Sequence, residues 1–429
     1  MKQSAAAPLH RVLGLVHVTA GGVGIIIGAG IYVLVGSATS EAGGGVWMSF
    51  VLAALVSFLT ALSYMELASM FPSAAGEYEY TRHAYPEYVA FLVGWVMVSG
   101  LMVAAAAVAL GFARYVTQFV DLDTRLSALG LLLLVTGIAL TGIRHSARLT
   151  VLLSLVQVGG LVLVIGIGIP HLGNENLLAV ESPGGLLGGA ALVFFAFIGF
   201  DEVITLAEET EDPVKTVPRG LFLALLISTI LYVGVAIAAV SVVGAQALGS
   251  SERPLADVIG HALGGRSGDV MASLAIVSTV NTTLLVVTAA SRLLYGMASQ
   301  GSMPAALARV SPNRRVPSNA VVLSALVAAG FVLIRDIALV ASVTDFAVYV
   351  VFLAVNSSVL LLRIRRPLAE RPYRIPGALG RLPVIPLLGL VSVVLMMTQL
   401  QAKATLLGIA LVGIGLLASF VVRKRPVAT

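Results

Sequence analysis

Long apolar runs constrain this chain more than any other feature of its sequence. A helix needs roughly 20 apolar residues to cross about 30 Å of hydrocarbon, and inside that layer every backbone polar group must be paired within the protein. We therefore predict an all-α integral membrane protein with about twelve transmembrane helices. The predicted spans are residues 12–38, 44–71, 87–120, 126–143, 149–169, 185–208, 217–244, 268–299, 318–334, 337–362, 383–400 and 403–422.

The composition excludes the common soluble classes. Hydrophobic residues make up 58% of the chain and charged residues 11%, and the mean hydropathy is +1.01, which is far more apolar than a soluble protein. The net charge of +5 does not indicate a nucleic-acid partner, because Lys and Arg lie in short loops between apolar runs. The chain has no Cys, so no disulfide or thiolate chemistry is expected. We see no cleaved signal peptide before the first apolar run.

The basic residues are distributed unevenly over the loops. If both ends of the chain lie in the cytoplasm, all but six of the 26 Lys and Arg residues fall on that side. The exceptions are Arg114, Arg125, Arg253, Arg266, Arg335 and Lys403. Because cytoplasmic loops carry an excess of positive charge, we predict cytoplasmic termini. No loop is long enough for a separate soluble domain, but 72–86 and 250–267 can each hold a short surface helix.

The first span contains glycines where a membrane helix should be most regular. In "GIIIGAGIYVLVG", residues 24–36, Gly24 and Gly28 form a GxxxG pair, and such pairs commonly permit close helix packing. The alternative is that the helix unwinds around Gly28, Ala29 and Gly30, so that its backbone can bind something.

The sixth span favours the second interpretation. In "FFAFIGFDEV", residues 194–203, Gly199 is followed by the carboxylates of Asp201 and Glu202 at mid-membrane depth. Carboxylates within a membrane are costly and usually functional. We therefore predict that this span unwinds around Phe197–Gly199.

The two interrupted spans occupy corresponding places in two halves of the chain. They are five spans apart, so they begin on opposite faces and the halves have inverted topology. Interrupted segments in matching positions indicate a transporter site near the membrane midplane. We predict one membrane transport domain over residues 1–429, with a first five-helix repeat at 12–169, a second at 185–362 and two additional helices at 383–422.

The ends of broken helices provide the chemistry of the site. An outer half-helix that begins near Gly28 has free N–H groups and a partial positive charge, which suit a carboxylate. The half-helix that ends near Phe197 has unpaired carbonyls, which accept hydrogen bonds from an ammonium. Donors on one side and acceptors on the other fit the head group of an amino acid.

The residues resemble the amino acid, polyamine and organocation (APC) superfamily of permeases, in the branch that includes cationic amino acid transporters. The motifs in the family's order are "GAGIYVLVG", "ALSYMELASMFPSAAGEYEY", "FFAFIGFDEVITLAEETEDPVKTVPRG", "SRLLYGMASQG" and "LRIRRPLAERPYRIPG". The resemblance implies a leucine-transporter-like fold, with ten core helices in two inverted repeats and two peripheral helices. It also implies amino acid transport by alternating access.

The resemblance implies a substrate site made mostly of main chain. Its carboxylate part matches Gly28, Ala29 and Gly30, and its ammonium part matches the carbonyls of Ile26, Phe195, Ala196 and Ile198. Phe195 would also gate the substrate, although a packed core aromatic is the alternative. A side chain added at Gly30 is expected to fill the space of the carboxylate.

Two positions depart from the family pattern. Many relatives carry a Lys in the fifth span, where sodium-coupled cousins bind their ion, but the best match here is Gln157, which has no titratable proton. In the third span, cation-transporting relatives have an acidic residue in the substrate pocket, whereas this chain has Ser99 and Gly100. We therefore predict a preference for neutral amino acids.

The coupling ion stays open between a proton and sodium. Asp201 can carry a proton, or it can be a structural hydrogen-bond acceptor for the broken helix. The hydroxyls of Thr282 and Thr283 can complete a sodium site with the carbonyls of Gly24 and Ile27, or they can bond neighbouring helices.

The remaining polar residues have simpler interpretations. The six His residues show no metal-ligand spacing. We predict solvated or capping roles for Glu66 and for the carboxylates after the sixth span, which are Glu208, Glu209, Glu211 and Asp212. The basic run "LRIRRP" is interpreted as a determinant of topology.

We thus predict a plasma-membrane permease for neutral amino acids, driven by protons or working by exchange. It is not an enzyme and needs no cofactor. Its partners are an amino acid, a proton or sodium as coupling ion, and membrane lipid, with no nucleic acid. The alternatives are a transporter of polyamines or other organic amines, a sodium-coupled amino acid symporter, and a nutrient sensor that does not transport.

Overall fold

The computed structural model describes residues 13–71, 76–141, 147–180, 182–203, 210–311, 314, 316–379 and 382–423. Within these ranges the chain is helical except for one antiparallel pair of short strands, β1 (Ala378–Leu379) and β2 (Leu382–Pro383). This confirms the predicted all-α class for the described residues. The predictions made for His10, His145, Glu208 and Glu209 lie outside them.

The helix boundaries follow the apolar runs. In chain order the helices are α1 (Leu15–Ile26), α2 (Gly30–Ala42), η1 (Gly43–Gly45), α3 (Val46–Met70), α4 (Gly76–Ala84), α5 (Glu87–Val116), α6 (Thr124–Thr141), α7 (Ala147–Gly168), η2 (Ile169–His171), α8 (Pro183–Val193), η3 (Phe194–Phe197), α9 (Pro213–Val243), α10 (Ala245–Ser250), α11 (Pro254–Leu263), α12 (Ser267–Ser299), η5 (Ala305–Ala308), α13 (Ser318–Val332), α14 (Ile337–Arg365), α15 (Val384–Thr398) and α16 (Ala402–Arg423).

Nine helical stretches in the described part of the chain are long and apolar enough to cross a membrane. One of them, Gly30–Met70, contains both α2 and α3, and three further apolar helices are shorter, namely α1, α13 and α15. The protein is therefore a multi-pass membrane protein, whereas the count of twelve passes and the two inverted repeats stay predictions.

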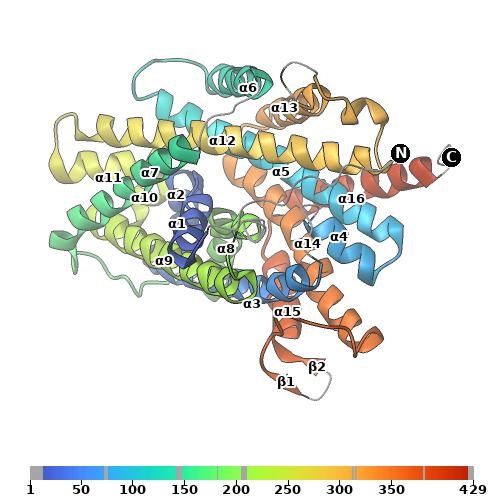
Figure 1. Ribbon diagram of the computed structural model, residues 1–429. Helices are drawn as coiled ribbons and strands as arrows, with labels where there is room; N and C mark the ends of the chain where they lie inside the picture. Colours follow the sequence, from blue (N-terminus) through green and yellow to red (C-terminus); the bar gives the residue numbers. More distant parts are fainter. Residues whose placement is uncertain are drawn as a thin grey trace.

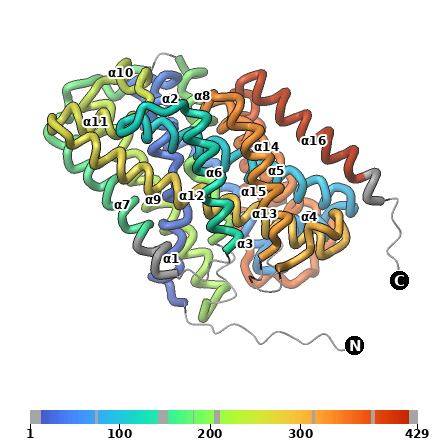
Figure 2. Tube along the Cα trace, turned by 90° about the horizontal axis from the view of Figure 1, so that it is seen from above, coloured from blue at the N-terminus to red at the C-terminus, as the bar shows by residue number. Residues whose placement is uncertain are grey.

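The helix bundle has two opposite faces, which we name by their elements. The terminal face is the one where α1 begins, α14 ends and α4 lies. The distal face is the one where α2 and α5 end and where α10 and α11 lie. In both views α10 and α11 are at the left and α4 is at the right (Figures 1 and 2). The helices α4 and α11 confirm the short helices predicted within 72–86 and 250–267.

Glycines allow the helices to approach closely. A Cβ added at Gly220 of α9 would lie 2.5 Å from the Val18 side chain of α1, and a Cβ at Gly22 would lie 2.8 Å from Ala224 of α9. No side chain larger than hydrogen fits at these two positions without a shift. Small residues at helix interfaces are typical of membrane proteins, where van der Waals packing drives helix association.

The prediction that Glu66 is solvated or caps a helix is wrong. Its side chain is only 1% exposed and forms ion pairs with Arg363 of α14 and Arg371, the latter at 3.2 Å. It also accepts the Ile375 N–H at 2.9 Å. The reason is that the ends of α3 and α14 pack together at the terminal face, so their charges meet between helices. Arg363 therefore does more than set topology, because it ties the loop after α14 to α3.

Candidate functional site

The first predicted break is present between α1 and α2. The helix α1 ends at Ile26, the Gly28 N–H bonds the Ile26 carbonyl at 2.8 Å, and α2 begins at Gly30. Among the hydrogen bonds of the described residues, the N–H groups of Gly30, Ile31 and Tyr32 have no acceptor. The start of α2 therefore offers the main-chain donors that were expected from the glycines.

An oxygen from another helix already lies at this helix start. The Ala29 N–H donates to Oγ1 of Thr282 on α12 at 3.1 Å, and a Cβ at Gly28 would lie 3.3 Å from the same oxygen. The hydroxyl oxygen occupies a position where a carboxylate oxygen would accept the same hydrogen bond. The structure thus brings Thr282 to the start of α2, where the substrate carboxylate is predicted to bind.

The second predicted break is present after α8. The α-helix ends at Val193 and continues as the 3₁₀ helix η3 to Phe197. Ile198 is extended, with φ of −60° and ψ of 137°, and Gly199 has a φ of +107°. That conformation is open to glycine and strained for other residues, so the position of Gly199 determines where the helix stops.

Carbonyls from the two breaks converge on one side chain that sequence reasoning missed. The Tyr232 hydroxyl of α9 lies 2.9 Å from both the Ile26 and the Ala196 carbonyl oxygens. The Phe195 carbonyl instead accepts the Ile198 N–H at 3.3 Å. Each carbonyl has two lone pairs, so Ile26 and Ala196 can accept a further hydrogen bond. The only signal in the sequence was a hydroxyl inside a membrane helix, which usually bonds a neighbour.

The two breaks are in direct contact at Gly30. A Cβ added there would lie 2.6 Å from the Ala196 Cα atom. The expectation that a side chain at Gly30 fills the space of the carboxylate is therefore wrong, because the missing side chain faces the backbone of the other broken helix. A larger residue at Gly30 would push the two broken segments apart.

The residues predicted to surround the substrate side chain are buried. Phe195 is 8% exposed and belongs to the same apolar cluster as Ala29, Val33 and Val287. Ser99 is buried on α5, next to Gly100, where a Cβ would lie 2.9 Å from the Cβ of Ala347 on α14. The structure thus assembles residues of α2, α5, α12 and η3 around the breaks.

Two of the groups predicted for a sodium site have hydrogen-bond partners within the protein. The Thr283 hydroxyl donates to the Thr279 carbonyl of its own helix at 2.7 Å. The Gly24 carbonyl accepts from the Ser154 hydroxyl at 3.5 Å, and a Cβ at Gly24 would lie 2.7 Å from that hydroxyl. Gly24 therefore serves close packing against α7, which was the simpler interpretation of the GxxxG pair.

The side chain of Gln157 is buried without a partner. It is 1% exposed, and neither its amide nitrogen nor its amide oxygen has a hydrogen-bond partner in the described part of the chain. Its backbone carbonyl accepts the Tyr32 hydroxyl at 2.6 Å. Gln157 thus links α7 to α2 through its main chain.

Asp201 meets a second carboxylate that sequence reasoning placed on a surface helix. Burial, together with the charge of Asp201, raises the pKa of Glu77 on α4 to about 8. Tyr64 of α3 lies beside both carboxylates. Glu77 is far from Asp201 in the sequence, and only the docking of α4 against the bundle brings the two together.

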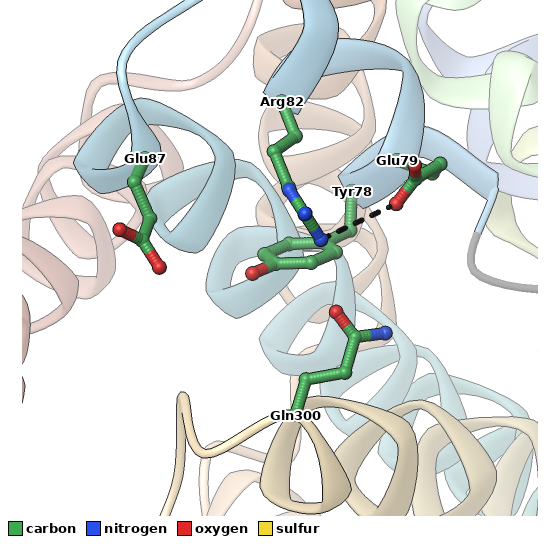
Figure 3. A pocket seen from close by; sticks show the side chains of 5 residues that line it. All are labelled: Tyr78, Glu79, Arg82, Glu87 and Gln300. Carbon is green, nitrogen blue, oxygen red and sulfur yellow. Dashed lines mark ion pairs between the residues drawn. The ribbon is translucent and has the colours of Figure 1, made fainter. Parts of the chain in front are cut away.

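Two surface cavities lie away from the breaks. One, of about 540 Å³, is lined by Tyr78, Glu79, Arg82, Glu87 and Gln300 at the terminal face. Figure 3 shows Glu87 across the opening from the ion pair of Arg82 and Glu79, whose atoms are 3.7 Å apart. The other, of about 340 Å³, lies at the distal face. Neither includes a residue of the predicted substrate site.

A multi-pass helical protein with two facing helix breaks has the architecture that is typical of a membrane transporter. The donors and acceptors belong to the main chain, as expected for a site that binds and releases a small polar molecule. Comparison with known families identifies the kind of transporter. The chain belongs to the amino acid permease family, whose profile matches residues 13–424.

Several relatives cover most of this chain. It is 30% identical over 403 residues to the branched-chain amino acid permease BcaP of Bacillus subtilis, covering 88% of this chain and 85% of that protein. It is 28% identical to the methylthioribose transporter of Bacillus subtilis, covering 99% and 95% of the two chains. It is 29% identical to the vacuolar cationic amino acid transporter 4 of Arabidopsis thaliana, covering 86% and 66%.

Proposed function

We propose that this protein is a secondary active transporter that moves neutral amino acids across the plasma membrane by alternating access. The observation that carries the proposal is the contact between the two helix breaks. The start of α2 presents main-chain N–H groups, while the Ile26 and Ala196 carbonyls point to a shared donor. A zwitterionic head group satisfies both sets at once.

The proposed architecture has two inverted five-helix repeats and cytoplasmic termini. The repeats at 12–169 and 185–362 each begin with a broken helix, which supports a pseudo-symmetric site between them. The excess of basic residues at the terminal face supports a cytoplasmic location for that face. The last two helices, within 383–422, lie outside the repeats.

The side-chain pocket supports a preference for neutral substrates. Ser99 and Gly100 stand where cation-transporting relatives have an acidic residue. Burial of a guanidinium or ammonium without a partner is costly. The similarity to a branched-chain amino acid permease supports the same preference, whereas the similarity to a cationic amino acid transporter supports the alternative.

We propose proton-linked transport or exchange rather than sodium symport. Two carboxylates that lie close together, such as the half-buried Asp201 and the buried Glu77, favour a shared proton because both cannot easily be ionised. Alternating access would change the exposure of Asp201, which follows the second break. Sodium symport stays the alternative, in which the Thr283 hydroxyl and the Gly24 carbonyl would bind the ion in addition to their present partners.

A second candidate function rests on the methylthioribose transporter, which matches nearly the whole chain. Such a sugar has neither a carboxylate nor an ammonium, so it would bind at the same breaks without the head-group contacts. A transporter of polyamines or other amines would use only the carbonyl side of the site. A sensor that binds without transport would show binding but no counterflow.

One experiment separates these functions. Purified protein in liposomes is tested for uptake of labelled amino acids, with sodium and proton gradients set independently. We expect alanine, serine and leucine to compete for uptake, and arginine, lysine, amino acid methyl esters and methylthioribose to compete poorly. Stronger competition by arginine or lysine would contradict the neutral preference, and equal competition by methyl esters would contradict recognition of the carboxylate.

A further inference from the structure

A carboxylate on α14 has no role in the site described above. Asp345 is completely buried, at 0% exposure, and neither of its side-chain oxygens has a hydrogen-bond partner among the residues that the structure describes. A buried polar group without a partner costs free energy, and a carboxylate inside a membrane costs more than most. Such a residue needs a physical explanation.

Asp345 lies between the distal face and the helix breaks. The helix α14 begins at Ile337 on the distal face, so a rise of about 1.5 Å per residue places Asp345 about 12 Å inside. One turn further along, the Tyr349 hydroxyl donates to the Ala191 carbonyl of α8 at 3.3 Å, and the Tyr349 ring lies 4.6 Å from the Phe194 ring. Because residues four apart share a helix face, Asp345 lies on the side of α14 that packs against α8.

Among the residues that the structure describes, no Lys or Arg side chain pairs with Asp345. The other titratable group that acts on it is Tyr349 on its own helix. The distal halves of the neighbouring helices carry Glu41 at the end of α2, Arg114 at the end of α5 and Lys403 at the start of α16, while α8 has no charged residue. These groups lie at the distal ends of their helices, whereas Asp345 is buried about two turns inside α14. A neutral, protonated carboxyl is the form that suits this environment.

We propose that Asp345 is a proton-binding site that controls opening of the distal face. The carboxyl is protonated while the helices packed on α14, α8 among them, keep it buried as they do in this structure. For the site between the breaks to open distally, the half-helices α2 and α8 must separate from the helices they pack on, which include α14. Water then reaches Asp345, its O–H bond breaks, and the proton passes to water.

The inference rests on the alternating access of the proposed function, but it does not depend on the substrate. Because the closed state binds the proton more tightly, acid favours the closed distal face. Between the pKa values of the open and closed states, the ratio of open to closed molecules changes by up to about tenfold per pH unit for one linked proton.

The test measures conformation rather than transport. Because the chain has no Cys, spin labels can be attached to introduced cysteines at Ser40, near the distal end of α2, and at Lys403 on α16. The helix α16 reports on the position of α14, because Gly408 of α16 packs directly against Phe346 of α14. We expect the long-distance population between the labels to grow as the pH is raised from 5 to 8.

The variants assign the proton to its residue. In Asp345→Asn, which mimics the protonated form, we expect the closed distance at every pH, and Asp345→Ser serves the same purpose if the amide variant folds poorly. Asp336→Asn removes an exposed carboxylate from the same helix while keeping a side chain that can cap it, and it should behave as the parent. A pH-dependent distance that survives in folded Asp345→Asn and Asp345→Ser would overturn the proposal, as would a parent distance that does not change with pH.

Failure of the proposed function is distinguishable from failure of this inference. If no amino acid is transported but the distance still changes with pH through Asp345, the gate stands and the substrate assignment is wrong. If amino acids are transported while the distance is independent of pH, the function stands and the role of Asp345 is refuted.

Discussion

Replacement of Thr282 by valine tests whether the substrate carboxylate binds the start of α2. In the empty protein the Ala29 N–H is paired with the Thr282 hydroxyl, so a carboxylate that takes this N–H only exchanges one acceptor for another. In Thr282→Val, which has nearly the same shape, the N–H is unpaired before binding. Binding of the substrate therefore adds one hydrogen bond in the variant, whereas in the parent it only replaces the bond to Thr282.

The expected effect follows from the net worth of that bond. A hydrogen bond contributes about 0.5–1.5 kcal/mol, and 1.4 kcal/mol corresponds to a factor of ten in the dissociation constant. We therefore expect Thr282→Val to bind a labelled neutral amino acid about two- to tenfold more tightly than the parent. The empty variant should also unfold at a lower temperature, because it leaves a buried N–H without a partner.

The neighbouring threonine provides a matched control. Among the described residues, the Thr283 hydroxyl bonds the Thr279 carbonyl of its own helix and no other group, so Thr283→Val should leave the affinity unchanged. Equilibrium binding to purified protein, with thermal unfolding as a check on folding, measures both variants. An affinity that is unchanged or weaker in folded Thr282→Val would falsify the reasoning. Loss of sodium-dependent binding in both variants would instead support the predicted sodium site.

Three further predictions concern the buried charges. With an inward proton gradient and no sodium, the parent should accumulate amino acid, while Asp201→Asn should lose accumulation and keep counterflow; accumulation that requires sodium and survives the substitution would refute proton coupling. Burial raises the pKa of Glu77 from 4.5 to about 8, so the folded protein binds this proton more tightly than the unfolded chain. Stability should therefore fall as the pH rises from about 5 to 8, by at most about 1.4 kcal/mol per pH unit, and Glu77→Gln should flatten the profile; an equal slope in both proteins contradicts this. Glu66→Gln leaves two buried arginines without their counter-charge and should destabilise the protein by about 3–5 kcal/mol. Asp212→Asn, which removes an exposed pair with Lys215, should cost about 1 kcal/mol or less, and similar losses in both variants would argue against a structural role for Glu66.

Much of the fold was predictable because it depends on local sequence. Apolar length determines where a helix can cross the membrane, and this placed the helices of the described residues. Glycine permits backbone geometry that other residues resist, so Gly28 and Gly199 indicated where the first and sixth spans are interrupted. Both interruptions are present in the structure.

The partners of buried polar groups were not predictable in the same way. Sequence reasoning missed Tyr232 and Glu77, and it assigned Glu66 to solvent. In each case the decisive neighbour comes from a helix that is distant in the sequence. A carboxylate near the end of a span is solvated or buried depending on which helix end packs beside it, and no local pattern specifies that neighbour.

The adjacent residues Thr282 and Thr283 show where local information ends. The sequence by itself determined that hydroxyls lie inside a membrane helix and that a broken helix exposes main-chain donors. Successive residues on a helix point about 100° apart, so only one of the two hydroxyls can face the break. Which one does so depends on the rotation and depth of α12 against α1 and α2. That rotation results from packing along the whole length of the helices, and therefore only the tertiary structure decided that Thr282 meets Ala29 while Thr283 bonds its own helix.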